Sequence, residues 1–98
     1  MALLREDEIE VRMHSVPGWH RTGDVIRRTV ILPDFIHAMG FVQSVALAAE
    51  RADHHPDIDI RWNTVSLSLT THRDGGLTEK DFSLALHINS IVPPQSKE

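Results

Sequence analysis

The sequence predicts an α+β fold of two layers, a four-stranded antiparallel sheet with helices packed on one face, in the order α-β-β-α-β-β-α. Its 98 residues are enough for one domain and too few for two, so residues 1–98 are expected to form a single domain. Two pairs of segments with alternating apolar residues are typical of hairpins. Segments of helical periodicity precede, separate and follow them, which favours helices against one side of an antiparallel sheet.

The first half of the chain is divided by recognisable start and stop signals. Residues 4–16 open with three acids, which suit a helix N-terminus, and end before a Pro-Gly pair. Residues 19–32 are expected to form a hairpin around the turn at 22–24. Asp34 then has the residue type of a helix N-cap, and the periodic pattern after it predicts a long helix that ends near Ala52.

This long helix is apolar over a wide arc and carries two stripes. One stripe is expected to cover the sheet. The other is expected to meet a second helix or another subunit, because so short a domain has little buried surface to spare. The second stripe therefore predicts a homo-oligomer, a dimer or tetramer. The first stripe contains Phe35, Met39, Val42, Ala46 and Ala49, and the second contains Phe41, Val45, Ala48 and Ala52.

The second half of the chain repeats the hairpin. Pro56 disfavours helical geometry at the residue before it, so residues 53–57 should end the long helix. Alternation then predicts a strand over 58–62, a tight turn at 63–64 and a strand from 65 that His72 ends. After a glycine-containing loop, Thr78 and Asp81 resemble a capping box that starts the last helix. The final residues, 93–98, are expected to fray.

Composition excludes several classes of function. The formal net charge is −4, which disfavours nucleic acid as a partner. The absence of cysteine excludes disulfides, thiolate metal sites and a cysteine nucleophile. The first residues do not resemble a signal peptide, and no apolar run approaches the roughly 18 residues of a membrane span. We therefore expect a cytoplasmic protein that binds no membrane.

Three of the seven histidines occupy positions where sites commonly form. His54 and His55 follow the long helix, and His72 follows the last strand; loops at the ends of elements often carry function. Histidine gains or loses a proton near neutral pH, since its unperturbed pKa is about 6.5. Exposed or structural histidines are the plain alternative. A zinc site is the functional alternative, but the chain has no His-Glu-x-x-His and no cysteine ligand, so no metal is expected.

A longer spaced pattern favours the functional interpretation. The motif Glu50-x3-His54-His55-Pro56-x5-Trp62-x9-His72-x8-Asp81 resembles the signature of the pterin-4a-carbinolamine dehydratase family. The resemblance extends over about residues 9–91. It departs from the family at three positions: Val30 and Leu32 stand where many members have phenylalanine, and Ile58 replaces an aromatic residue of some members.

The resemblance implies a reaction and a set of partners. Members of the family dehydrate 4a-hydroxytetrahydropterins, such as 4a-hydroxytetrahydrobiopterin, to quinonoid dihydropterins in tetrahydrobiopterin recycling. The substrate comes from aromatic amino-acid hydroxylases, and the reaction uses no metal or organic cofactor. The alternative is a non-catalytic binding or assembly partner, such as a transcriptional cofactor or an assembly chaperone, that acts through its helix surface.

The resemblance also implies roles for individual residues. His54 and His72 are the candidates for acid–base catalysis, and His55 chiefly orients or binds the pterin. Substrate-binding or orienting roles are expected for Glu50, Asp53, Pro56, Trp62, Thr71 and Asp81. For Glu50 and Asp81 the structural alternatives are an exposed helix acid and a helix cap. If the histidines line an open pocket, replacing them should cost little stability.

Overall fold

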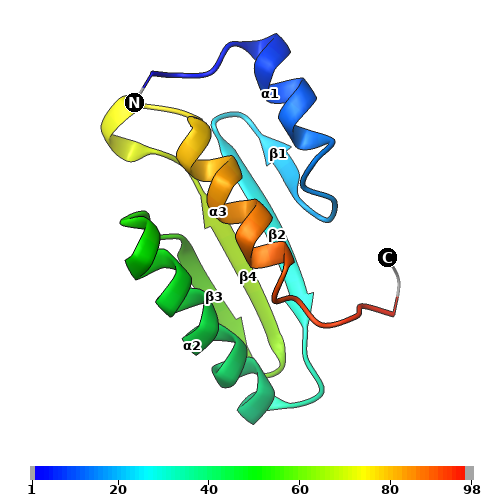
Figure 1. Ribbon diagram of the computed structural model, residues 1–98. Coiled ribbons are helices and arrows are strands. Elements are labelled where there is room, and N and C mark those ends of the chain that lie inside the picture. The colour runs from blue at the N-terminus through cyan, green and yellow to red at the C-terminus, as the bar shows by residue number, and fades with distance from the viewer. Residues whose placement is uncertain (1, 97–98) are drawn as a thin grey trace.

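Four antiparallel strands form one open sheet with the spatial order β1-β2-β4-β3 in the computed structural model, which describes residues 2–96 (Figure 1). The helices are α1 (Glu6–Met13), α2 (Phe35–Ala52) and α3 (Glu79–Asn89). A 3₁₀ turn, η1 (His72–Asp74), follows the last strand. The predicted order of helices and strands is confirmed. Residues 1, 97 and 98, which the single-domain prediction includes, lie outside the described residues. The strands are β1 (His20–Thr22), β2 (Val25–Ile31), β3 (Asp57–Arg61) and β4 (Thr64–Leu69).

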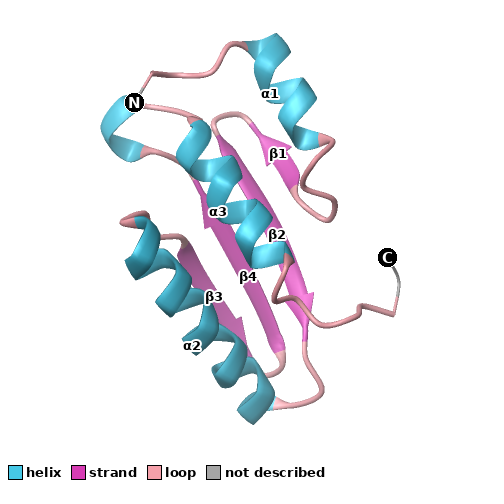
Figure 2. Cartoon of the chain, viewed as in Figure 1, coloured by secondary structure: helices cyan, strands magenta, loops and turns pink. Residues whose placement is uncertain are grey.

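The alternation along the two central strands separates a buried face from an open face. The register places Ile26 opposite Leu69 and Val30 opposite Val65, and all four side chains are fully buried. Helices α2 and α3 lie across this face (Figure 2). Thr29 and Ser66 project from the other face, where their hydroxyls are 3.1 Å apart. The predicted two-layer arrangement is confirmed, since period-two burial leaves one apolar face for helices to cover.

The prediction of which side of α2 faces outward is wrong. Phe41, Val45 and Ala48, which were expected to meet a second helix or another subunit and on which the predicted homo-oligomer rested, are buried in the core of this chain. The apolar residues that α2 exposes are Phe35, Ile36, Met39 and Leu47, hereafter the outer α2 face. Both stripes had suitable periodicity, so the sequence pattern could not decide which one the sheet and α3 would cover.

Three element boundaries also differ from the prediction. Helix α1 is shorter than 4–16, because Glu8 accepts a hydrogen bond from the Arg5 backbone at its start and the Ser15 hydroxyl donates to the Arg12 carbonyl at its end. The β3–β4 turn is at 62–63 rather than 63–64, with Trp62 at φ 53° instead of in the strand. Gln95 forms two hydrogen bonds with the backbone of Ile31, so the tail does not fray at that residue.

The N-cap of α2 predicts a measurable dependence of stability on pH. Asp34 Oδ1 accepts hydrogen bonds from the backbone N–H of His37 (2.8 Å) and from its Nδ1–H (2.7 Å). Both bonds lower the pKa of Asp34 below its usual value, and the backbone hydrogen bond has the larger effect. A depressed pKa in the folded state adds stability above the unfolded pKa of about 3.9, and that stability is lost as the pH falls through the folded pKa.

We therefore expect the advantage of the native protein over Asp34→Asn to be constant above about pH 5 and to shrink below it. Denaturant unfolding of both proteins across this range measures the difference. Asp24→Asn, in the β1–β2 turn, is the control because its carboxylate caps no helix. A difference between the native protein and Asp34→Asn that stays constant down to about pH 2 would contradict the expectation.

Candidate active site

After the C-terminus of α2, the side chains of the adjacent residues His54 and His55 point in different directions. Asp53, the C-cap, has the left-handed conformation φ 51°, ψ 44°, which aspartate tolerates better than most residues. The backbone N–H of His54 then donates to the Ala49 carbonyl at 3.1 Å. As a result the His54 side chain is buried, while the side chain of His55 is exposed.

A buried carboxylate holds the His54 ring. The His54 Nε2–H donates to Asp81 Oδ1 at 2.6 Å, and Asp81 is completely buried. Asp81 Oδ2 accepts from the Thr71 hydroxyl (2.8 Å) and from the Thr78 backbone N–H (2.9 Å). Since a carboxylate only accepts, Nε2 must carry the proton, and neutral His54 has Nδ1 as its free acceptor. The predicted capping box of α3 is confirmed, and the same aspartate also orients the histidine.

The second histidine is held at the surface by a different acid. The His55 Nε2–H donates to Glu50 Oε2 at 2.5 Å, and both side chains are more than half exposed. Glu50 lies in the last turn of α2, five residues before His55, so the hydrogen bond forms across the helix end. An exposed pair of this kind contributes little to stability. It does restrict the orientation of the His55 ring.

The third histidine does not end a strand, as predicted, but begins η1. Strand β4 stops at Leu69, and Thr71 forms an isolated bridge with Gly76 that closes a tight loop between them. Gly75 has φ 78° at the end of η1, a conformation that suits glycine. His72 is exposed at the start of this loop. Among the described residues, no side-chain hydrogen bond holds the His72 ring.

A cavity of about 270 Å³, hereafter the histidine cavity, brings the three histidines together from two separate parts of the chain. The end of α2 contributes His54 and His55, and the segment after β4 contributes His72. Two of the other predicted residues, Asp53 and Thr71, also line it. Glu50 and Asp81 reach it through the histidines that they bind. The remaining lining residues are Thr70, Arg73, Asp74 and Lys80.

Two further predicted residues, Pro56 and Trp62, neither line this cavity nor bind one of its histidines. Pro56 contributes through the backbone, since it separates the histidine turn from β3. Trp62 is 70% exposed in the β3–β4 turn. Strand β3 begins near the C-terminal end of α2, directly after Pro56, and runs away from that end (Figure 1). Five strand residues span about 17 Å, so Trp62 lies at the opposite end of the sheet.

Sequence reasoning did not single out Arg73, Asp74 and Lys80. The first two directly follow His72, so their proximity in sequence was an available signal. Lys80 lies beside Asp81 on α3 and donates to the Asp53 carbonyl at 3.3 Å. Only the packing of α3 against the end of α2 brings this lysine to the histidines.

Residues 2–96 have neither a cluster of metal-ligating side chains nor a membrane-spanning helix. Within this range no group of three or more His, Cys, Asp or Glu side chains is arranged to hold a metal ion. The prediction that the chain needs no metal stays a prediction. Within the same range no helix is long and apolar enough to cross a membrane.

Comparison with known proteins identifies the family of this chain. The model of the family described as pterin 4 alpha carbinolamine dehydratase matches residues 2–91. The chain is 56% identical over 91 residues to a protein of Roseiflexus castenholzii, covering 93% of this chain and 98% of the relative. It is 47% identical over 92 residues to a protein of Mycolicibacterium smegmatis, covering 94% and 98%. Both relatives are named, provisionally, as pterin-4-alpha-carbinolamine dehydratases. This chain therefore belongs to the pterin-4-alpha-carbinolamine dehydratase family.

Solved structures support the same assignment of fold. A crystal structure described as a transcriptional coactivator/pterin dehydratase from Brucella melitensis superposes with a TM-score of 0.87 at 35% identity, covering 92% of this chain and 98% of that one. A pterin dehydratase-like protein identified as a RuBisCO assembly factor in the alpha-carboxysome superposes with a TM-score of 0.65 at 18% identity, covering 79% and 92%. The second match shows the fold alone.

Proposed function

We propose that this chain removes water from 4a-hydroxytetrahydropterins by histidine acid–base catalysis, as a step in tetrahydrobiopterin recycling after an aromatic amino-acid hydroxylase. The observation that carries the proposal is the histidine cavity, where His54 and His72 meet from separate elements. His54 is held in one tautomer by a buried carboxylate, and no hydrogen bond from the described residues occupies the His72 ring. One ring is thus prepared to accept a proton and the other is available to donate one.

The proposed reaction needs two proton transfers and no redox partner. The C4a–O bond breaks as the 4a-hydroxyl receives a proton and leaves as water. The N5–H bond breaks as a base removes its proton, and the electron pair forms the C4a=N5 double bond of the quinonoid dihydropterin. Protons given and taken are equal, so the products are the dihydropterin and one water molecule. Each assisted transfer typically accelerates a reaction about 10²- to 10⁴-fold.

The arrangement of the site favours one division of roles. His54 Nδ1 is the acceptor for the N5 proton, because Asp81 binds the other ring nitrogen. His72 protonates the leaving hydroxyl. His55, paired with Glu50 at the rim, binds or orients the pterin. The decisive experiment is a dehydration assay with freshly generated 4a-hydroxytetrahydropterin, corrected for the uncatalysed reaction.

Removal of metal ions should leave this activity unchanged. The proposed steps use only imidazole protons, so protein treated with a chelator and then desalted should keep the kcat/KM of untreated protein. The control is the same protein treated with the chelator already saturated with calcium. Activity that disappears on chelation and returns with added zinc would contradict cofactor-free catalysis.

Self-association through the outer α2 face is a separate prediction. Ile36 is 81% exposed and Met39 44% exposed on the same side of α2, and a second copy would cover both. Light scattering should give a mass of at least twice 11.1 kDa, and Ile36→Glu with Met39→Glu should shift it toward the monomer. Leu86→Glu, at an exposed position on α3, is the matched control. An 11.1 kDa species alone at micromolar concentration would contradict the prediction.

The outer α2 face also supports the second candidate function, a non-catalytic binding or assembly role. Such a role needs the exposed apolar side chains of α2 and not the histidine cavity. The two functions can be separated, because variants of the outer α2 face should lose partner binding while variants of His72 should lose dehydration. A protein that binds a partner but shows no dehydration above the uncatalysed rate would favour the second candidate.

A further inference from the structure

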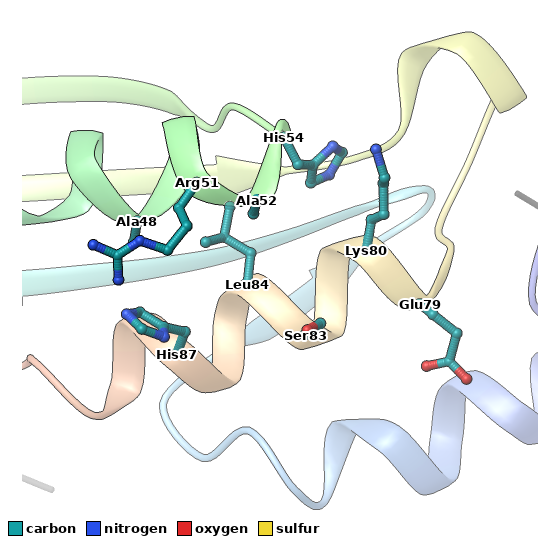
Figure 3. A pocket seen from close by; sticks show the side chains of 9 residues that line it. All are labelled: Ala48, Arg51, Ala52, His54, Glu79, Lys80, Ser83, Leu84 and His87. Atoms are coloured by element: carbon teal, nitrogen blue, oxygen red, sulfur yellow. The ribbon is translucent and has the colours of Figure 1, made fainter.

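A groove between α2 and α3 opens beside the histidine cavity. Its volume is about 410 Å³, and it shares His54 and Lys80 with that cavity as lining residues. The floor is apolar and consists of Ala48, Ala52 and Leu84 (Figure 3). A molecule bound at the histidines can therefore extend past Lys80 into the groove without leaving the protein surface.

Basic side chains surround this apolar floor. Arg51 and His87 lie toward one end of the groove, and Lys80 lies with His54 toward the other (Figure 3). Within residues 2–96 no carboxylate forms an ion pair with Arg51 or His87. In a chain whose net charge is −4, tertiary structure has thus gathered basic groups that come from two separate helices. An anion is the ligand that this arrangement favours.

The one acid on the groove wall does not offset these charges. Glu79 binds Arg12 of α1 through both carboxylate oxygens. These hydrogen bonds lower the pKa of Glu79 and keep it ionised and engaged away from the groove. Figure 3 shows its side chain directed toward a neighbouring helix rather than toward Arg51 or His87.

We infer that this chain, besides the 4a-hydroxytetrahydropterin with the short neutral biopterin side chain, also accepts and binds more tightly a 4a-hydroxytetrahydropterin whose C6 side chain has an apolar, aromatic body and ends in an anionic group. The inference rests on the proposed function, because it places the pterin ring at the three histidines. The apolar body of the side chain lies on Ala48, Ala52 and Leu84, and the anionic end reaches Arg51 and His87. Lys80 to His87 spans seven residues of α3, about 10 Å, which suits a side chain with one aromatic ring between the pterin and its carboxylates.

The test compares stable dihydropterins that share the ring and differ in the side chain. The probes are 6-methyl-7,8-dihydropterin, which is neutral, 7,8-dihydrofolate, which has a benzoyl body and carboxylates, and 7,8-dihydroneopterin phosphate, which has a short polar chain and a phosphate. Calorimetry at low ionic strength should give about tenfold tighter binding for dihydrofolate than for the methylpterin. The affinity of dihydroneopterin phosphate should exceed that of the methylpterin by a smaller factor, because its side chain lacks the apolar body.

Variants of the groove then test which residues cause the tighter binding of dihydrofolate. Arg51→Gln with His87→Gln should remove most of the advantage of dihydrofolate and leave methylpterin binding within about twofold, since neither residue touches the ring. Arg61→Gln removes one positive charge from β3, outside the groove, and should change neither affinity. Added salt should weaken dihydrofolate binding more than methylpterin binding.

The outcomes separate the inference from the proposed function. Equal affinity for the methylpterin and dihydrofolate, or an advantage that survives in the Arg51 and His87 double variant, overturns the inference and leaves the dehydratase proposal standing. If dihydroneopterin phosphate binds more tightly than dihydrofolate, the inference of an aromatic side chain that carries carboxylates is wrong. Failure of all three pterins to bind at millimolar concentration overturns both.

Discussion

Replacement of His72 by alanine is expected to lower kcat/KM for dehydration about 10²-fold or more, with almost no change in the free energy of unfolding. His72 is exposed at the start of η1 and none of the described hydrogen bonds holds its ring, so its removal takes away a proton donor and no packing. Steady-state kinetics and denaturant unfolding on the same preparation measure both quantities. His87→Ala, which removes an exposed histidine from the adjacent groove, is the matched control for catalysis with a neutral 6-methyl substrate.

His54 needs a different substitution, because the structure changes the expectation for it. This histidine is buried and supplies one of the hydrogen bonds to Asp81, so His54→Ala should also destabilise the fold by about 1–3 kcal/mol. His54→Gln keeps an N–H near the position of Nε2 while it removes the Nδ1 acceptor. We expect a folded protein that has lost about 10²-fold or more of its activity.

Combined replacement of the three histidines tests whether they form the catalytic site. Because His54, His55 and His72 act on one reaction, the triple variant should lose less than the product of the single losses. A folded triple variant with full activity would place the chemistry elsewhere in the chain. Loss of folding on replacement of His72 alone would make that residue structural.

Replacement of Asp81 by alanine is expected to have the largest effect on stability, about 3–5 kcal/mol. Its carboxylate accepts hydrogen bonds from His54, Thr71 and Thr78, and all three residues are buried, so removal of the carboxylate takes the acceptor away from buried donors. Thermal or denaturant unfolding measures the loss. Asp57→Ala, at an exposed carboxylate of β3, is the control and should stay within about 0.5 kcal/mol of the native protein.

Asp81→Asn separates support of the fold from orientation of the histidine. An amide cannot accept from all three donors, so His54 should lose its preference for the Nε2–H tautomer, and activity should fall about 10²-fold or more. Nitrogen NMR of the His54 ring reports the tautomer directly. An Asp81→Asn protein with native activity and an unchanged tautomer would show that Asp81 acts only as the helix cap.

Local sequence patterns determined most of the architecture of this protein. Alternation in β2 and β4, the Asp34 N-cap, the proline after the histidine pair and the capping box at Thr78 each act over a few residues, so each can be recognised without knowledge of the partner elements. The same holds for the identity of the candidate histidines, because their spacing resembles one family. The boundaries that failed, at Trp62 and His72, lie where a turn geometry rather than a periodic pattern decides the conformation.

Tertiary structure decided the rest. Both stripes of α2 have helical periodicity, and only packing against the sheet and α3 determined that Phe41, Val45 and Ala48 are buried while Ile36 and Met39 are exposed. The pairing of His54 with Asp81 joins residues 27 positions apart, and the basic groove joins α2 to α3. Such contacts depend on which surfaces exclude water together, and that is a property of the assembled layers rather than of any local segment.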